Sequence, residues 1–340
     1  MATHRTQRQI LLDTLANYHE LGIDKQIDYD KFYLYSLITH STAIEGSTVT
    51  EVENQLLFDE GITAKGRTLQ EQMMNLDLKA AYDRCIELAT HHVTISVELL
   101  KSLAALVMKN TGSSYNTALG SFSSANGDLR KLNVTAGVGG RSYMSFQKVP
   151  QRLQEFCEWI NLQRDKVNKN DITACYNLSF DAHFRLVTIH PWADGNGRMA
   201  RLVMHFLQME NNLIPVKVTK DQKSDYIQAL IDTRESDDLD VFRNVMQKLH
   251  ISNMQYEIGM FKQSMNDEKI GDILNDVTNV TNRHNNILQL LKTNEHITTS
   301  ELAALLHVTK RTVLRDIATL KQSSRLERIG SLRTGRWKVL

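Results

Sequence analysis

The sequence predicts a mainly α-helical protein, and three observations lead to this prediction. Only three prolines (Pro150, Pro191 and Pro215) occur in 340 residues, so few positions forbid a continuing helix. Apolar residues return every three to four positions over long stretches, which is the period of one face of an α-helix. One glycine-rich segment, residues 110–149, interrupts this pattern. We therefore expect a helical bundle with a single irregular region.

The expected helices cover most of the first 262 residues. Their apolar spacing places them at residues 7–18, 30–45, 68–90, 96–109, 150–163, 172–189 and 197–210, with further helix over 224–262. Within the glycine-rich region, residues 132–134 and 141–146 are expected as two short strands around a turn at 136–140. A loop of this length in a compact domain is more often functional or mobile than idle.

Composition narrows the class of protein. With 41% hydrophobic and 23% charged residues, the chain is globular, and at roughly 150 residues per domain its length suggests two domains. The longest apolar run is far shorter than the roughly 18 residues of a membrane helix, and the N-terminus lacks the apolar segment of a signal peptide. Three cysteines are too few for a disulfide framework. We expect a cytoplasmic protein with no membrane partner.

The formal net charge of +1 hides an uneven distribution. Residues 283–340 hold eleven Lys or Arg against four acidic residues, so this tail carries +7 and residues 1–282 carry −6. Such asymmetry predicts that the two parts have different partners. We expect an N-terminal helical region over residues 1–67, a core over 68–262, a polar linker over 263–282 and a basic tail domain.

The strongest motif is HPWADGNGRMAR, residues 190–201. A helix ends before it, a glycine-flanked loop follows, and a new helix begins near Gly197, so main-chain amides and a helix N-terminus form a site for an anion. Arg198 and Arg201 lie on one face of that helix and suit a polyphosphate. Asp194 suits a divalent cation that bridges phosphates, and His190 suits proton transfer near neutral pH. These parts together predict transfer of a phosphorus-centred group to a hydroxyl.

The motif resembles the signature of the Fic family, H-P-F-x-D/E-G-N-G-R-x-x-R. Every polar position matches, and Trp192 replaces the usual phenylalanine. The resemblance implies a Fic-type helical bundle that transfers AMP from ATP, with Mg²⁺, to a Ser, Thr or Tyr hydroxyl of a target protein or of the chain itself. It also implies that residues 130–147 form a β-hairpin flap that pairs with the target.

The resemblance also implies roles for individual residues. His190 would be the general base, Asp194 would hold Mg²⁺, and Arg201 would bind the γ-phosphate. The residues implied to grip the α- and β-phosphates are Gly195, Asn196, Gly197 and Arg198. We expect His183, seven residues before His190 on the same helix face, to be buried scaffold. Tyr226 is expected in the core as an aromatic residue on a helix, with a place near the nucleotide base as the alternative.

A second motif precedes the core. Residues 41–46, STAIEG, close the helix expected at about 30–46, and Gly46 is a natural C-cap. A glutamate at this end of a helix is disfavoured by the helix dipole. The string matches the family's inhibitory motif, S/T-x-x-x-E-G/N. The resemblance implies that Glu45 pairs with Arg201 and keeps it from the γ-phosphate, and that Ser41 supports this arrangement.

The basic tail, residues 283–340, resembles a winged helix-turn-helix domain. A capping-box pattern at residues 298–301 opens a helix with Leu305 inward, and a third helix to about residue 321 has Leu314 inward. We expect DNA contacts from this third helix and from a basic wing, through Lys310, Arg311, Thr312, Arg315, Arg333 and Arg336. Because winged helices also serve as docking or dimerisation modules, a homodimer is an alternative for this domain.

The sequence therefore predicts an autoinhibited Fic-type AMP transferase joined to a winged helix-turn-helix module. One alternative is a DNA-binding transcriptional regulator whose Fic domain senses nucleotide without turnover. Another is a Fic enzyme that uses a different nucleotide donor or removes AMP from a target. The intact pair of His190 and Asp194 favours an enzyme, since a pure sensor does not need the base.

Overall fold

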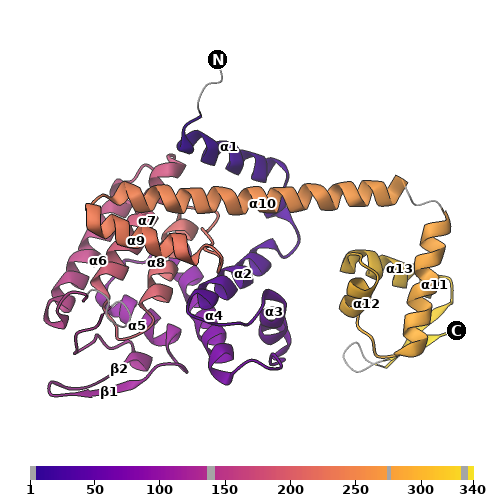
Figure 1. Ribbon diagram of the computed structural model, residues 1–340, viewed down its shortest axis with the longest axis horizontal. Helices are drawn as coiled ribbons and strands as arrows, with labels where there is room; N and C mark the ends of the chain where they lie inside the picture. Colours follow the sequence, from indigo (N-terminus) through magenta and orange to yellow (C-terminus); the bar gives the residue numbers. More distant parts are fainter. Residues whose placement is uncertain (1–4, 136–141, 274–276, 331–335) are drawn as a thin grey trace. The chain divides into compact units, whose positions relative to one another are not determined.

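The computed structural model describes residues 5–135, 142–273, 277–330 and 336–340 (Figure 1). The chain divides into two compact units, Met1–Ile258 and Gly259–Leu340, and each is described by itself. Among the described residues, none of the helices has the combination of length and apolar character that a membrane span requires.

The first unit is helical, as the sequence predicts. Its helices are α1 (Gln7–Glu20), α2 (Tyr29–Ile44), α3 (Glu51–Glu60), α4 (Leu69–Thr90), α5 (Val97–Val107), α6 (Val149–Lys166), α7 (Ile172–Ile189), α8 (Asn196–Glu210) and α9 (Lys223–Ser236), and α10 (Leu239–Ile273) begins in it. Helix α3 was not expected, and residues 224–262 form two helices, separated at Asp237 by a left-handed backbone (φ 55°). The segment expected as a linker is helical up to Ile273.

The core of this unit surrounds α7 and α8, which pack on each other, and α8 also packs on α4. Most side chains of α8 are buried, including residues on every side of the helix. Leu186 of α7 and Leu202 of α8 lie in one apolar cluster with residues of α4, α5 and α6. This packing fixes the C-terminal end of α7 against the N-terminal end of α8, where the HPWADGNGRMAR motif lies.

Helix α2 is held on α3 and α4 by a buried network of polar side chains. Thr42 donates to Asn75 Oδ1 (2.8 Å), and Asn54 Nδ2 donates to the same oxygen (2.9 Å) and to Thr39 Oγ1 (2.7 Å). Asn75 Nδ2 in turn donates to Ser47 Oγ (3.2 Å). All five residues are buried, and buried polar groups need partners with defined directions. The network therefore gives α2 a defined position just before Glu45.

The glycine-rich region contains a hairpin that was not expected, in which β1 (Ser114–Thr117) pairs antiparallel with β2 (Gly120–Ser123). Of the expected flap, Thr135 and Ser142 form an antiparallel bridge, and Tyr143 N donates to Val134 O (3.0 Å). The two flanking segments lie antiparallel over this short contact, but the strand prediction was wrong for the described residues: neither 132–134 nor 142–146 forms a strand, and Phe146 begins a 3-10 helix (Phe146–Lys148). The expected turn at 136–140 lies outside the described residues.

The second unit is a small α+β domain. It contains α11 (Val277–Thr293), α12 (Thr299–Leu305) and α13 (Lys310–Gln322), and β3 (Leu326–Ile329) pairs antiparallel with β4 (Arg336–Val339). Its core includes Ile287, Leu302 and Trp337. The inward placement of Leu305 and Leu314 was wrong, because both are more than half exposed. Leu305 is the last residue of α12, and Leu314 lies beside the buried stripe of α13 rather than in it.

Candidate active site

The site is built on the loop between α7 and α8. Helix α7 ends because His190 has a left-handed backbone (φ 52°) and Pro191 follows it. Gly195 (φ 81°) caps α8, and a Cβ on it would lie 2.8 Å from Met108 Sδ. A side chain at this position would therefore be both strained and obstructed.

Asn196 braces this loop from inside. Its Oδ1 accepts from Trp192 N (3.0 Å) and its Nδ2 donates to Trp192 O (2.9 Å). Trp192 is buried, and its indole Nε1 donates to Gly127 O (3.1 Å). Trp192, which replaces the usual phenylalanine of the motif, thus has a hydrogen-bond acceptor for its indole N–H. Both polar atoms of the Asn196 side chain serve the loop, and its role toward phosphate stays a prediction.

Arg201 lies one turn into α8 and is only 2% exposed. Its Nε donates to Ser41 Oγ (2.8 Å), and its Nη2 donates to Ser41 O (3.0 Å) and to Glu45 Oε1 (2.6 Å). The contact between α2 and the motif, expected from the sequence, is thus present in the structure as an ion pair with two supporting hydrogen bonds.

The carboxylate of Glu45 lies over the N-terminal turn of α8. A Cβ built on Gly197 would lie 2.7 Å from Glu45 Oε1 and 3.1 Å from Arg201 Nη1. Burial by itself raises the pKa of Glu45, but the charge and hydrogen bond of Arg201, with Arg198 and Lys223 nearby, hold this pKa below its usual range. An anion therefore already lies at the N-terminal end of the helix, where the sequence predicts an anion site.

Arg198 and Asp194 lie close to each other at the start of α8. Arg198 is buried, and its Nη1 and Nη2 reach Val107 O (3.3 Å) and Met108 Sδ (3.1 Å), while Nη2 lies 3.7 Å from Asp194 Oδ1. Asp194 Oδ1 accepts from Gly195 N (2.6 Å), and the rest of this side chain is largely exposed.

A metal ion at this position would have one protein carboxylate. Among the described residues, no group of three or more His, Cys, Asp or Glu side chains could hold a metal. Mg²⁺ usually takes one or two carboxylates and completes its shell with phosphate oxygens and water. The exposed Asp194 beside an anion site fits an ion of this kind.

His190 is half-buried at the C-terminal end of α7. Its Nδ1 lies 3.3 Å from Val187 O, and because a carbonyl only accepts, the hydrogen is placed on Nδ1 and the lone pair on Nε2. Burial lowers the pKa of His190 to about 4. Arg130 and Arg234 act in the same direction, and the Val187 carbonyl and Glu45 act against it. The imidazole is therefore neutral at physiological pH and able to accept a proton.

Two residues that sequence reasoning missed hold His190 from the flap side. The ring of Tyr143 stacks on the imidazole, with centroids 3.8 Å apart and planes 17° apart. The buried Arg130 donates through Nε to His190 O (2.7 Å), through Nη1 to Leu132 O (2.8 Å) and through Nη2 to Met144 O (2.6 Å).

The expectation that His183 and Tyr226 are buried scaffold is confirmed. Tyr226 O–H and His183 Nε2 lie 2.8 Å apart, and both residues are buried. Burial, with the charge of Arg201 nearby, holds the pKa of His183 well below its usual range, so the ring is neutral. Tyr226 also interacts with Arg201, so the buried pair of His183 and Tyr226 supports the arginine side chain from inside the bundle.

In the second unit, the side chains expected to contact DNA lie mainly at the start of α13. Lys310, Arg311 and Arg315 are exposed, whereas Thr312 is half-buried and hydrogen-bonds to the N-cap residue Thr309. Arg333, also predicted as a contact, lies outside the described residues. Three exposed cations at a helix N-terminus remain available to a phosphate backbone.

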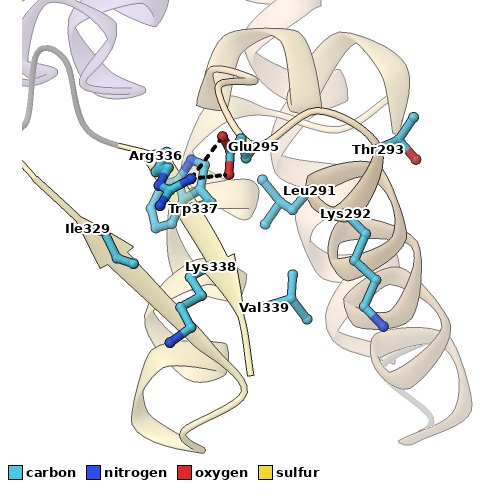
Figure 2. Close-up of a pocket in the computed structure, with 9 residues that line it drawn as sticks. All are labelled: Leu291, Lys292, Thr293, Glu295, Ile329, Arg336, Trp337, Lys338 and Val339. Atoms are coloured by element: carbon cyan, nitrogen blue, oxygen red, sulfur yellow. Dashed lines mark hydrogen bonds and ion pairs between the residues drawn. The ribbon is translucent and has the colours of Figure 1, made fainter.

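Arg336, the other predicted wing contact, is engaged at a pocket of about 540 Å³ (Figure 2). Its Nη1 lies 3.2 Å from both carboxylate oxygens of Glu295, at the edge of a hollow whose apolar walls include Leu291 and Val339. Because both side chains are about half exposed, the pair is screened by solvent and contributes little stability.

Comparisons with known proteins agree with the geometry. Residues 94–208 match the model of the Fic/DOC family, and residues 283–332 match that of an HTH domain. The chain is 25% identical over 241 residues to "Protein adenylyltransferase fic-1" of Caenorhabditis elegans, an alignment that covers 69% of this chain and 43% of that protein. It is 27% identical over 228 residues to "Protein adenylyltransferase Fic" of Drosophila grimshawi, with 66% and 43% covered. The chain thus spans less than half the length of these curated relatives.

Solved structures show the same fold. A Fic domain-containing signalling protein from Bacteroides thetaiotaomicron aligns with a TM-score of 0.61 at 20% identity, covering 75% of this chain and 98% of that one. A Fic family protein from Desulfovibrio desulfuricans aligns with a TM-score of 0.55 at 16% identity, covering 97% and 96%. The chain therefore has the Fic fold, residues 94–208 match the Fic/DOC family model, and residues 283–332 match a helix-turn-helix domain.

Proposed function

We propose that the chain is a protein adenylyltransferase that its own helix α2 holds inactive. The observation that carries this proposal is the Glu45 carboxylate lying on Arg201 and over Gly197, at the N-terminus of α8 and close to the neutral His190. A base, an anion site and two arginines are the parts that nucleotidyl transfer to a hydroxyl requires. The names of the relatives from Caenorhabditis and Drosophila support AMP as the group transferred.

In the proposed reaction, the hydroxyl oxygen of the target attacks the α-phosphorus of ATP. The new O–P bond forms as the bond from the α-phosphorus to the bridging oxygen breaks, and pyrophosphate leaves with that electron pair. His190 Nε2 takes the proton of the hydroxyl, because Nδ1 is committed to Val187 O. Amides at the start of α8, with Arg198 and Arg201, stabilise the charge on the phosphates.

A magnesium ion held by Asp194 would neutralise charge on the α- and β-phosphates. The protein's own part is to hold Asp194 in place through Gly195 N and to present its carboxylate to solvent.

Inhibition in this proposal is electrostatic. While Glu45 occupies Arg201, the γ-phosphate lacks its cation and meets a carboxylate instead, so ATP does not adopt the productive pose. Ser41 supports the inhibited state because it accepts two hydrogen bonds from the same guanidinium.

The test uses the full chain with Mg²⁺ and α-labelled ATP, GTP, CTP or UTP, alone and with lysate. Glu45→Gly should label protein strongly from ATP, wild type weakly, and the double variant with His190→Ala not at all. Equal labelling by wild type and Glu45→Gly would contradict autoinhibition. Label from another nucleotide would identify that nucleotide as the donor. Loss of label from a modified target would indicate that the chain removes AMP. No label from any nucleotide would favour a nucleotide-sensing regulator.

We also propose that the second unit binds duplex DNA, because Lys310, Arg311 and Arg315 are exposed at the start of α13. The Arg311→Ala/Arg315→Ala double variant should weaken binding and reduce the slope of log K against log salt by about 2. Lys321→Ala, at the other end of the helix, is the matched control. Absence of binding to random duplex at low salt would favour a docking role instead.

A further inference from the structure

We propose that Tyr143, carried by the flap and anchored there by Arg130, is a positioning residue that orients the imidazole of His190. This inference rests on the proposed function, since it assigns to His190 the role of base. It adds to that function a group which contacts neither ATP nor the target hydroxyl in the proposed reaction and acts through the base alone.

The imidazole needs a second restraint. Its one hydrogen bond among the described residues, from Nδ1 to Val187 O, is 3.3 Å long, whereas N–H to carbonyl bonds are usually about 2.9 Å. A single long bond at one ring atom leaves the tilt of the ring weakly defined. The stacked ring of Tyr143, with ring centroids 3.8 Å apart and planes 17° apart, restricts this tilt over the whole face of the imidazole.

Stacking leaves the reactive atom accessible. The lone pair of Nε2 lies in the plane of the imidazole, whereas Tyr143 covers a face of the ring. A hydroxyl can therefore approach Nε2 edge-on while Tyr143 stays in place. This geometry suits a residue that orients the imidazole, and it does not suit one that blocks access to Nε2.

Arg130 makes the position of Tyr143 depend on that of His190. Its three hydrogen bonds join the carbonyl of His190 to those of Leu132 and Met144, on the two sides of the flap, and its own amide donates to Pro191 O (3.0 Å). The residue next to Tyr143 is thus fixed to the same guanidinium as the backbone of the base.

Arg234 of α9 completes the arrangement. Its guanidinium carbon lies 5.3 Å from the centroid of the Tyr143 ring, within the range of a cation–π contact. The charged groups that face His190 are therefore Arg130, Arg234 and Glu45, from the flap, α9 and the end of α2. The two arginines lower the pKa of His190 together with burial, and Tyr143 contributes to that burial.

The test compares Tyr143→Ala and Tyr143→Phe with Tyr115→Ala. Tyr115 is a matched control, because it stacks on Phe122 in the β1–β2 hairpin with a centroid distance of 4.9 Å and is likewise half-buried. Activity is measured in the full chain with Glu45→Gly. We expect Tyr143→Ala to lower kcat about tenfold with KM for ATP within about twofold, and Tyr143→Phe and Tyr115→Ala to keep kcat.

A second measurement is independent of activity. The pKa of His190 is followed by NMR on labelled histidine in chains without the Glu45 change, with the His190 signal identified by its loss in His190→Ala. Tyr143→Ala should raise this pKa from about 4 toward 6.5 because it opens the ring to water, and the other two variants should leave it unchanged. Thermal melting checks that each variant is folded.

Two activity results would overturn the inference: a rise in kcat in Tyr143→Ala, which would make the ring an obstruction, or an equal loss in Tyr143→Phe, which would assign the effect to the hydroxyl. An unchanged His190 pKa in folded Tyr143→Ala would also overturn it. If Glu45→Gly transfers no nucleotide at all, the proposed function fails, and the NMR measurement still decides whether Tyr143 positions the ring.

Discussion

Replacing Glu45 by glutamine separates the charge of the inhibitory contact from its shape. The side chain keeps its length and one oxygen that can accept from Arg201 Nη2, now 2.6 Å from Glu45 Oε1. The remaining bond still has the charged guanidinium as its donor, so the difference between the two contacts is the attraction between two unit charges, about 4 kcal/mol at a separation of about 4 Å near a protein surface. Because the Glu45 side chain is 33% exposed, solvent screens part of the difference, and we take it as about 1–2 kcal/mol.

That difference predicts a five- to thirtyfold rise in kcat/KM for ATP in Glu45→Gln, since about 1.4 kcal/mol corresponds to a factor of ten. Glu45→Gly removes the whole contact and should raise kcat/KM for ATP further, by about thirty- to hundredfold. The assay is the initial rate of labelling at ATP well below KM. Strong activation by Gly with none by Gln would refute the electrostatic argument and assign inhibition to steric obstruction.

The pH dependence gives the same reasoning a second check. Arg201 keeps the pKa of Glu45 below its usual range, so the carboxylate stays charged until the pH falls below about 4.5. The ratio of Glu45→Gln to wild-type activity should therefore be constant between pH 5.5 and 8. A ratio that fell to one on acidification to pH 5.5 would show that the charge is lost too early for this account.

Three further predictions concern stability. Trp192→Phe should cost about 1–2 kcal/mol in urea unfolding, because Gly127 O loses its indole partner, and an unchanged midpoint would contradict this. Gly127→Ala, whose Cβ would lie 2.0 Å from Lys101 O, should destabilise far more than Gly66→Ala, which also has a positive φ (81° against 69°) and nothing within 4 Å; equal melting temperatures would refute the clash. Burial lowers the pKa of His205 to about 4 against 6.5 when unfolded, so the unfolded chain binds the proton first and up to about 3 kcal/mol is lost as the pH falls from 6.5 to 4. Melting curves of folded His205→Gln should show a smaller loss over this range, and an identical one would contradict the assignment.

The helices could be predicted because their signals are local. The expected segments 172–189 and 68–90 match α7 and α4 to within one residue, since apolar period and capping residues act over one or two turns. Helix α3 was missed although Thr50 and Glu53 form a capping box at its start, because its apolar pattern is short and weak.

The residues of the candidate site likewise fall into those that the sequence predicted and those that it did not. The HPWADGNGRMAR loop and the Glu45–Arg201 pair were predicted, the first from its own residues and the second through the family resemblance. Arg130 and Tyr143 were not, because a basic and an aromatic residue in a glycine-rich segment have no local pattern that marks them. Their contacts with His190 join positions 47 to 60 residues apart and exist only once the chain is folded.

The polar network of Thr42, Asn54 and Asn75 determines how precisely α2 is placed along its own axis. A helix that packs through aliphatic side chains alone can slide by a full turn, about 5.4 Å, and still bury similar surface. Directional amide contacts restrict the register, because a shift of α2 would break the hydrogen bonds that Thr42 and Thr39 make with Asn75 and Asn54 inside the core. By restricting the register of α2, the network also fixes the position of Glu45 opposite Arg201.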